Sequence, residues 1–178
     1  GTEDTIRLLE SLRVQTDTAF DVIVVDNDSE ASEREKLGAY AASYPGALDI
    51  VYAPQNFGFS GGNNIGIRKA LAQRSNWILL INNDTMVTPH FIGDIRTQFS
   101  DTPSVIGIPI QEGGRVAYAG KVQWCVSTLQ HLYTIALHAP TSYVIGAGLL
   151  VHRDVFERVG LLDESYFLYF EDADFSIR

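Results

Sequence analysis

Residues 77–84 constrain the fold more than any other stretch, because the apolar run Trp77–Ile81 ends abruptly in two amides and a carboxylate, Asn82-Asn83-Asp84. An apolar run of this length is typical of a strand buried on both faces of a parallel sheet. The polar residues then stand at the carboxyl edge of the sheet, where open α/β folds bind ligands. Asp84 is suited to anchor a divalent cation that carries a diphosphate. Asn-Asn-Asp-Thr is equally ordinary turn chemistry, so this stretch alone leaves both interpretations open.

Helical and strand patterns alternate along the first 110 residues of the chain. The predicted order is helix 2–16, strand 20–25, helix 32–44, strand 48–53, glycine-rich loop 54–66 with a helix to 74, strand 77–81, helix 89–99 and strand 105–110. Thr2 is the expected cap of the first helix, and Ser32-x-x-Glu35 a capping box for the second. This alternation predicts an α/β fold, a three-layer αβα sandwich with a mainly parallel central sheet.

The remaining residues follow a less regular pattern. Gly113-Gly114 predicts a turn after which 116–119 pairs back as a hairpin. Residues 121–140, rich in Gln, Thr, His and Tyr, predict an irregular and partly exposed segment. A strand at 143–152, a short helix at 153–159 ended by Gly160, and a final helix after the aromatic run 166–170 complete the prediction.

Composition narrows the class of protein. A chain of 178 residues fits a single domain, and a net charge of −9 disfavours nucleic acid as a partner. No run approaches the length of a membrane span. The single Cys125 predicts a packed thiol in a reducing compartment. The scattered histidines form no recognisable zinc motif, and no serine stands in a hydrolase elbow.

Asp26 ends the strand predicted at 20–25, where a carboxylate can accept hydrogen bonds from a ribose hydroxyl or a base N–H. The alternative is an Asx-turn or a helix cap, since the residues that follow, Asn27, Asp28 and Ser29, all favour turns.

The glycine-rich loop brings free backbone N–H groups to a predicted helix N-terminus, which suits a diphosphate. It contains Gly58, Gly61, Gly62 and Gly66 together with Asn56, Asn63 and Asn64. It matches neither the dinucleotide fingerprint nor the P-loop. The alternative is a tight, closely packed connection between a strand and a helix.

Three acids, Glu171, Asp172 and Asp174, follow the aromatic run. Asp174 and Arg178 have the spacing of a helical ion pair, which directs Asp172 elsewhere. Burial against aromatic rings should raise the pKa of Asp172 and make it a candidate general base. The rings expected to exclude water are Phe167, Tyr169 and Phe170. Alternatively, these acids only complement the helix dipole.

Four segments together resemble family 2 glycosyltransferases, in particular the bacterial subgroup similar to rhamnosyltransferases. They are Val22–Ser29, Asn56–Gly66, Leu79–Asp84 and Phe167–Arg178, in the order and spacing of that family. Each segment alone is a weak indication of the family, whereas the four in this order are specific for it. The resemblance implies a GT-A fold, a nucleotide-diphosphate sugar donor, Mg²⁺ or Mn²⁺, inversion at the anomeric carbon, and a glycan or lipid-linked acceptor. It implies a cytoplasmic enzyme of polysaccharide and cell-envelope biosynthesis, with peripheral association at the inner face of the membrane.

The resemblance also implies a role for each matching residue. Asp26 would hold the base or ribose, and Asp84 would bind the metal. Asp172, beside Glu171, would be the general base. The donor would lie along Asn56, Gly58, Gly61, Gly62, Asn63 and Asn83, and the donor sugar and acceptor beside Gly146, Ala147 and Gly148.

Two departures from the family pattern matter. Asn82 replaces the first acid of the D-x-D motif, so we expect weak metal binding without nucleotide. The family's first strand would precede Gly1, so we interpret residues 1–178 as one catalytic domain that lacks its first strand and its C-terminal part. A nucleotidyltransferase and a non-catalytic nucleotide-sugar-binding module are the alternative functions.

Overall fold

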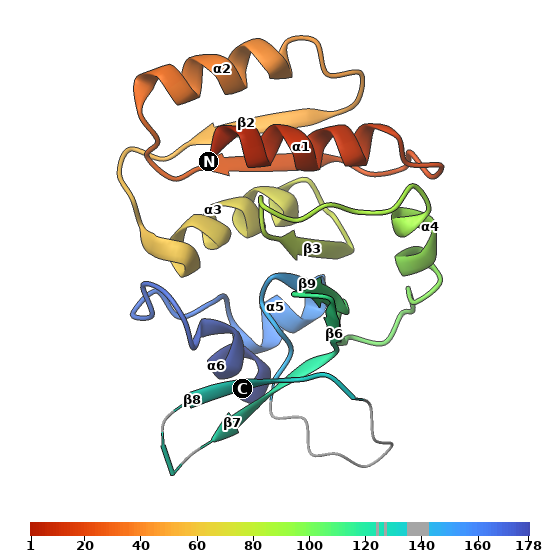
Figure 1. Ribbon diagram of the computed structural model, residues 1–178, viewed down its shortest axis with the longest axis vertical. Helices are drawn as coiled ribbons and strands as arrows, with labels where there is room; N and C mark the ends of the chain where they lie inside the picture. The colour runs from red at the N-terminus through yellow and green to blue at the C-terminus, as the bar shows by residue number, and fades with distance from the viewer. Residues whose placement is uncertain (124, 127, 135–142) are drawn as a thin grey trace. The chain divides into compact units, whose positions relative to one another are not determined.

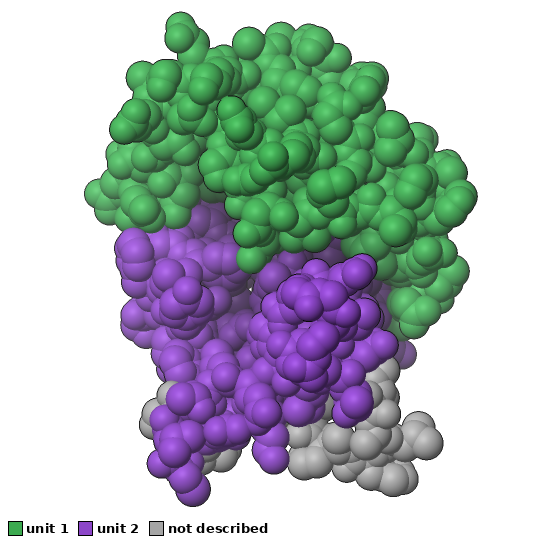
Figure 2. Space-filling view, in the orientation of Figure 1, with its two compact units in different colours: residues 1–56, 82–101 green, residues 57–81, 102–178 purple. Residues whose placement is uncertain are grey.

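The structure, a computed structural model, describes residues 1–123, 125–126, 128–134 and 143–178. The chain forms two compact units (Figure 2). Unit 1 contains Gly1–Asn56 and Asn82–Asp101, and unit 2 contains Phe57–Ile81 and Thr102–Arg178. Because each unit combines two separate stretches of the chain, the division is not a simple split into two consecutive domains. The interpretation of residues 1–178 as one catalytic domain stays a prediction.

Unit 1 contains a parallel pair of strands (Figure 1). Its elements are α1 (Thr2–Arg13), β1 (Val22–Asp26), α2 (Ala31–Ala41), β2 (Leu48–Tyr52) and α4 (Phe91–Arg96). The helix α2 supplies the crossover that a parallel connection requires. In this register Asp26 pairs with Tyr52, which puts Asp26 at the carboxyl end of the pair.

Helices α1 and α2 of unit 1 lie against each other and are joined by two polar contacts, one of which is a 3.4 Å hydrogen bond from Thr2 Oγ1 on α1 to the Glu33 carbonyl on α2. The Tyr40 hydroxyl on α2 donates a hydrogen bond of 2.7 Å to Glu10 on α1. The buried apolar residues of these helices and of α4 are Leu8, Leu9, Leu12, Leu37 and Ile92. Their helical spacing is the amphipathic pattern expected of surface helices.

Unit 2 is organised around a central buried strand, β9 (Gly148–His152), all of whose residues are buried. It lies between β3 (Trp77–Ile81) and β4 (Val105–Gly107) and runs antiparallel to both. Parallel pairing is thus confirmed for β1 and β2, whereas β9 is reversed. The reason is connectivity: the chain from β4 to β9 contains hairpins in place of the helical crossover that parallel pairing needs. The helices of unit 2 are α3 (Gly58–Ala72), α5 (Arg153–Val159) and α6 (Glu171–Ile177).

Two hairpins lie between β4 and β9. The first pairs β5 (Ile110–Glu112) with β6 (Arg115–Ala117), which confirms the turn predicted at Gly113-Gly114. The second pairs β7 (Ala119–Gln123) with β8 (Thr128–Leu132). The prediction of an irregular segment at 121–140 is therefore wrong for the described part of that range. Trp124, Ser127 and 135–142 lie outside the described residues. The polar residues that suggest irregular structure occupy the outward positions of the second hairpin, whereas its inward residues Val122 and Leu129 belong to the apolar cluster that contains Ala117, Tyr143, Ile145 and Ala173.

Three predicted helix ends differ from the structure. Gly1 stands at the N-cap of α1 in place of Thr2, which is buried. Glu30 stands at the N-cap of α2, so the capping box at Ser32 is absent. Helix α4 spans Phe91–Arg96, shorter than the predicted 89–99. Tertiary contacts override local signals at helix ends; Thr2, for example, donates to the Glu33 carbonyl on α2.

The glycine-rich loop predicted at 54–66 is wrong over most of its length, because α3 already begins at Gly58. The reason is a close approach from another part of unit 2. A Cβ on Gly58 would lie 2.4 Å from the Phe167 carbonyl oxygen and 2.7 Å from the Phe167 ring. Gly58 also has a positive φ of +72°. Part of the glycine content is therefore explained by packing and backbone geometry, the alternative left open above.

We predict that Gly58→Ala destabilises the protein far more than Gly114→Ala. Both glycines have a similar positive φ, +72° and +78°, but an added Cβ at Gly114 meets nothing within 4 Å. Gly114→Ala should cost about 1 kcal/mol of unfolding free energy from φ alone, and Gly58→Ala about 2 kcal/mol more from the clash. Urea unfolding of both variants measures the difference. Equal destabilisation would contradict the packing role of Gly58.

Candidate functional site

The predicted site residues lie in both units. Unit 1 holds Asp26, Asn56, Asn83 and Asp84, and unit 2 holds Gly58, Gly61, Gly62, Asn63, Gly146, Ala147, Gly148, Glu171 and Asp172. Each group is described within its own unit.

Asp26 is the buried acid of unit 1, with 5% of its surface exposed. Its Oδ1 accepts hydrogen bonds from the Ser29 backbone N–H at 3.1 Å and from Arg34 Nε at 2.9 Å. The Asx-type bond to Ser29 is the turn chemistry that the sequence allowed, and the ion pair with Arg34 compensates a charge that would be costly to bury alone.

Arg34 is a residue that the sequence interpretation missed. Besides Asp26, its guanidinium donates to Asp28 Oδ1 at 3.3 Å and to the Ala53 carbonyl at 3.0 Å, and lies 5.6 Å from the centre of the Tyr52 ring. A shallow, open hollow of about 540 Å³ lies beside it, lined by Ala31, Ser32, Arg34, Glu35 and Tyr52. A basic residue one turn into the helix after an acid-ended strand was the available signal.

Asn56 contacts the segment that follows β1. Asn27 Nδ2 donates to Asn56 Oδ1 at 3.1 Å. This bond joins the two polar segments that follow neighbouring parallel strands, as expected for carboxyl ends at one sheet edge.

Residues Asn82–Thr85 form a turn in unit 1, with the Thr85 N–H donating to the Asn82 carbonyl at 3.2 Å. Asn83 Nδ2 donates to Thr5 Oγ1 at 3.1 Å and to the Gly1 carbonyl at 3.2 Å, which holds this turn on the start of α1. The Asp84 side chain is exposed. These residues form a turn and also expose the Asp84 carboxylate, so the interpretation as a turn and the interpretation as a metal anchor are compatible.

A divalent cation fits Asp84 as one ligand of an incomplete donor set. Among the described residues no group of three or more His, Cys, Asp and Glu side chains could hold a metal. One carboxylate oxygen next to amide groups is the kind of hard donor set that Mg²⁺ and Mn²⁺ use when phosphate oxygens and water supply the other ligands.

In unit 2 the start of α3 is occupied by the backbone of the segment before α6. The Phe59 N–H donates to the Phe167 carbonyl at 2.7 Å, and Ser60 Oγ donates to the Tyr166 carbonyl at 2.7 Å. The Phe59 N–H is therefore not free for an anion, contrary to the expectation of free N–H groups here. Gly61 admits the Phe57 side chain, which would lie 2.6 Å from an added Cβ. Asn63 Nδ2 bonds the Phe59 carbonyl within the helix.

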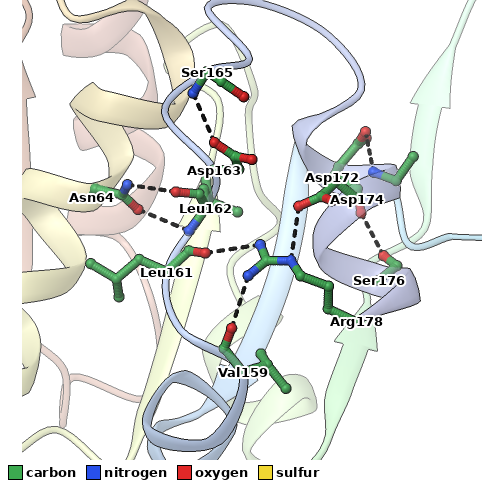
Figure 3. Close-up of polar contacts among 11 residues, drawn as sticks. Asn64, Val159, Leu161, Leu162, Asp163, Ser165, Asp172, Asp174, Ser176 and Arg178 are labelled. Carbon is green, nitrogen blue, oxygen red and sulfur yellow. Dashed lines mark hydrogen bonds and ion pairs between the residues drawn. The ribbon is translucent and has the colours of Figure 1, made fainter.

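Asp172 in α6 is bonded to the glycine stretch before β9 (Figure 3 shows part of this helix). The Gly146 N–H donates to Asp172 Oδ2 at 2.9 Å, and the Ala173 N–H donates to Oδ1 at 2.8 Å. A Cβ on Gly146 would lie 3.1 Å from Asp172 Cβ, so the missing side chain allows this approach. Burial raises the pKa of Asp172, and the backbone bonds and His131 oppose that shift. The predicted direction is confirmed.

The predicted cause of that desolvation is wrong, however. Phe167, Tyr169 and Phe170 are exposed on the surface. The apolar cluster beside Asp172 instead includes Tyr143 and Ala173. Burial, and then the nearby Asp172 charge, raise the pKa of Tyr143 to about 12.

Glu171 lies deeper than Asp172. It is 6% exposed, and its Oε2 has no hydrogen-bond partner among the described residues. Burial raises the pKa of Glu171, and the Asp172 charge adds to the shift. A carboxyl so placed is not presented to solvent, unlike Asp172, which is partly exposed.

Asp174 and Arg178 form the predicted ion pair at 2.8 Å. Arg178 also donates to the carbonyls of Val159 and Leu161, at 2.8 and 2.9 Å, so it fastens the end of α6 to the segment after α5 (Figure 3). Asp172 is thereby left without this cation, as the spacing predicted.

The structure also bears on Cys125, on the histidines and on membrane-spanning helices. Cys125 is exposed, so a packed thiol is wrong. His131 Nδ1 lies 2.7 Å from Glu112 Oε1, and this contact followed by the Tyr133 hydroxyl lowers the pKa of Glu112. His138 lies outside the described residues. None of the helices that the structure describes has the length and apolar character to traverse a bilayer.

Comparison with known proteins identifies the family. Residues 3–160 match the family described as glycosyl transferase family 2, and the chain belongs to it. The family predicted from the four segments is confirmed.

Two relatives with a named activity are similar over most of this chain. The low-salt glycan biosynthesis hexosyltransferase Agl10 of Haloferax volcanii is 28% identical over 167 residues, covering 88% of this chain and 52% of its own length. The dTDP-rhamnosyl transferase RfbF of Shigella flexneri is 24% identical over 161 residues, covering 88% of this chain and 53% of its own length. The chain spans about half the length of these relatives.

Solved structures with a similar fold include two that were determined with UDP. S. aureus TarS residues 1–349, also solved with UDP, has a TM-score of 0.73 at 17% identity, over 98% of this chain and 51% of that solved fragment. GalNAc-T7 with UDP, GalNAc and Mn²⁺ has a TM-score of 0.78 at 17% identity, over 99% of this chain and 38% of its own. The predicted α/β fold of GT-A type is confirmed.

We predict that Glu171→Gln raises stability at neutral pH. Folding raises the pKa of Glu171 above its ordinary 4.5, so the folded state holds this proton more tightly than the unfolded state. Its contribution to the unfolding free energy is therefore present below pH 4.5 and is lost as pH rises through the folded pKa. Denaturant unfolding from pH 4 to 8 should show that the unfolding free energy of the variant, relative to that of the wild type, increases as pH rises.

Glu164→Gln is a control for which the opposite pH dependence of stability is expected. Hydrogen bonds from Asn64 and Arg68 lower the pKa of Glu164, so its contribution is present above pH 4.5 and is lost as pH falls. This variant should be less stable than the wild type at pH 7. A Glu171→Gln difference that does not change with pH would contradict the burial effect.

Proposed function

We propose that the protein is a nucleotide-sugar-dependent glycosyltransferase that inverts the anomeric centre. Membership of glycosyl transferase family 2 supports the reaction type. The observation that carries the mechanism is Asp172: a partly exposed carboxylate with a raised pKa, held by the Gly146 N–H at 2.9 Å. Since the chain spans about half the length of its curated relatives, the proposal concerns the catalytic part of the whole protein.

On the donor side, Asp26 and Arg34 are proposed to bind the nucleoside. Arg34 already neutralises Asp26, so the pair can bind a neutral base or ribose without leaving an unpaired buried charge. Asn56 and Asn83 supply amide groups, and the start of α3 with Gly58, Gly61, Gly62 and Asn63 follows the donor. Of these, Gly58, Gly61 and Gly62 are buried, so they act by permitting close approach of other parts of the chain.

Asp84 is proposed to be the protein ligand of Mg²⁺ or Mn²⁺. When bound, the cation would neutralise charge on the departing diphosphate as a Lewis acid. Mn²⁺ in the structures of GalNAc-T7 and of a Pyrobaculum calidifontis mannosyltransferase supports a divalent cation. The exposed carboxylate of Asp84 suits a site that the nucleotide completes.

On the acceptor side, Asp172 is proposed to be the general base. It takes the proton of an acceptor hydroxyl while that oxygen forms a bond to the anomeric carbon and the bond from this carbon to the diphosphate oxygen breaks. The raised pKa of Asp172 makes it a stronger base than an exposed Asp. Ala147 and Gly148 continue the segment that holds it. The buried Glu171 is proposed to position α6 rather than to contact substrate.

The acceptor is proposed to be a glycan or a lipid-linked saccharide. The relatives named for glycan biosynthesis and for dTDP-rhamnosyl transfer support a hexose or rhamnose donor and a role in cell-envelope polysaccharide synthesis. We propose a cytoplasmic location with peripheral association at the inner face of the membrane.

We predict that Asp172→Asn lowers transfer by about 10²- to 10⁴-fold, the usual contribution of a general base. Asn keeps one oxygen that can accept from Gly146 and loses only the acceptor of the adjacent Ala173 N–H, so nucleotide binding and fold should persist. Sugar transfer from a panel of uridine, thymidine and guanosine diphosphate sugars is the measurement. Asp174→Asn, two residues further along α6, is the matched control and should retain most activity. Near-normal turnover of Asp172→Asn would make the base assignment wrong, and absence of transfer in the wild type would favour a non-catalytic binding module.

We predict that Asp84→Ala weakens nucleoside diphosphate binding about tenfold or more in Mn²⁺ and little in its absence. The exposed Asp94→Asn in the same unit is the control. Calorimetric titration of UDP, dTDP and GDP with and without Mn²⁺ measures both. Identical curves for Asp84→Ala and wild type in Mn²⁺ would count against the metal role.

A further inference from the structure

The segment between α5 and α6 is anchored tightly at one end and exposed at the other. Asn64, on α3, bonds both the N–H and the carbonyl of Leu162, at 3.1 and 2.9 Å (Figure 3). Ser60 and Phe59, at the start of the same helix, bond the carbonyls of Tyr166 and Phe167, both at 2.7 Å. The backbone is therefore fixed up to Phe167.

The aromatic side chains after this anchor are partly exposed to solvent, although the Phe167 ring also lies close to Gly58. Phe167 is 58% exposed, Tyr169 67% and Phe170 37%. These three residues are called the aromatic platform. Tyr169 and Phe170 have positive φ values of +69° and +72°. Left-handed backbone is unfavourable for aromatic residues, and two in succession at side chains that remain exposed suggest a functional constraint.

The platform leads directly to the proposed base. Phe170 stands at the N-cap of α6, and Asp172 lies in the first turn of that helix. An acceptor hydroxyl that donates its proton to Asp172 must bring the rest of the acceptor close to these residues.

The charges around the platform favour one kind of occupant. The acids Asp163, Glu164, Glu171, Asp172 and Asp174 flank it in sequence. The flanking Arg178 is engaged by Asp174 and by two carbonyls, and Arg68 bonds Glu164. Anionic membrane surfaces bind segments that combine apolar and basic residues. This segment combines apolar residues with acidic ones instead. A neutral sugar ring offers C–H groups to the electron-rich face of an aromatic ring and hydroxyls to carboxylates.

We propose that the aromatic platform of Phe167, Tyr169 and Phe170 binds a sugar ring of the acceptor in front of Asp172. The inference deepens the proposed function and rests on it. It makes the acceptor a carbohydrate at the point of attack, recognised by stacking on exposed aromatic faces.

Saturation-transfer NMR tests this directly. The protein is loaded with Mg²⁺, which is diamagnetic and does not broaden the ligand signals, and with the nucleoside diphosphate that gives the largest thermal shift. The probes are the methyl glycosides of α-L-rhamnose, α-D-mannose and β-D-galactose at millimolar concentration. Ring protons of at least one glycoside should receive saturation in the wild type, and the signal should fall at least fivefold in Tyr169→Asn. Asn removes the ring yet tolerates the left-handed conformation.

Matched variants separate stacking from folding. Tyr169→Phe keeps the ring and Leu168→Ala changes an exposed neighbour without a ring, so both should retain the signal. Phe170→Asn, which places a favourable capping residue at the N-cap, should reduce it. Retention of the signal in Tyr169→Asn and Phe170→Asn, or its absence with every glycoside in the wild type, would overturn the proposal.

Two further outcomes would also overturn it. One is binding to vesicles of phosphatidylglycerol and phosphatidylethanolamine that Tyr169→Asn abolishes, which would make the patch a lipid contact. The other is a large loss of melting temperature in Tyr169→Asn, which would make it a packing surface. Failure of every nucleoside diphosphate to shift the melting temperature would instead refute the proposed function itself, and the inference with it.

Discussion

The buried amide of Asn64 is the contact on which the proposed acceptor side of unit 2 depends. It is 1% exposed, and its two ends satisfy both the N–H and the carbonyl of Leu162, while Nδ2 also reaches Glu164. A buried amide that loses such partners is left with unsatisfied polar groups, which is expensive in an apolar interior. These bonds set the path of the chain from α5 to α6, and so determine where the aromatic platform and Asp172 lie within the unit.

The carboxylates of the described residues fall into two classes according to the direction in which their pKa values are shifted. Acids such as Asp17, Glu33 and Glu164 have pKa values lowered by hydrogen bonds from Arg96, Lys36 and Asn64 respectively, so they stabilise the folded state near neutral pH. Glu171 and Asp172 are the carboxylates with resolved shifts whose pKa values rise, in both through burial. Adjacent acids kept at a cost to folding are typical of functional sites, and the bond from Gly146 keeps one of them oriented.

The elements could be predicted from the sequence better than their contacts. Local patterns placed the alternation up to β4, the end of α5 at Gly160, the start of α6 at Glu171 and the Asp174–Arg178 pair, because each depends on residues a few positions apart. The bonds of Asn64 join residues about 100 positions apart, and the start of α3 at Gly58 depends on Phe167. Arg34 was missed for the same reason: its acid partner lies on another element. The roles of the site residues remain predictions.

The hairpins between β4 and β9 have a consequence for how this chain can change in evolution. The strand β9 pairs with β3 and β4 without using any residue of β5 to β8, so recombination could exchange these hairpins and leave the sheet intact. Yet their apolar core includes Tyr143 and Ala173, and Tyr143 fills the space over Gly120, where an added Cβ would lie 1.9 Å from its ring. A productive exchange would therefore have to carry matching residues at 143 and 173, which ties inheritance of the hairpins to inheritance of the helix that bears Asp172.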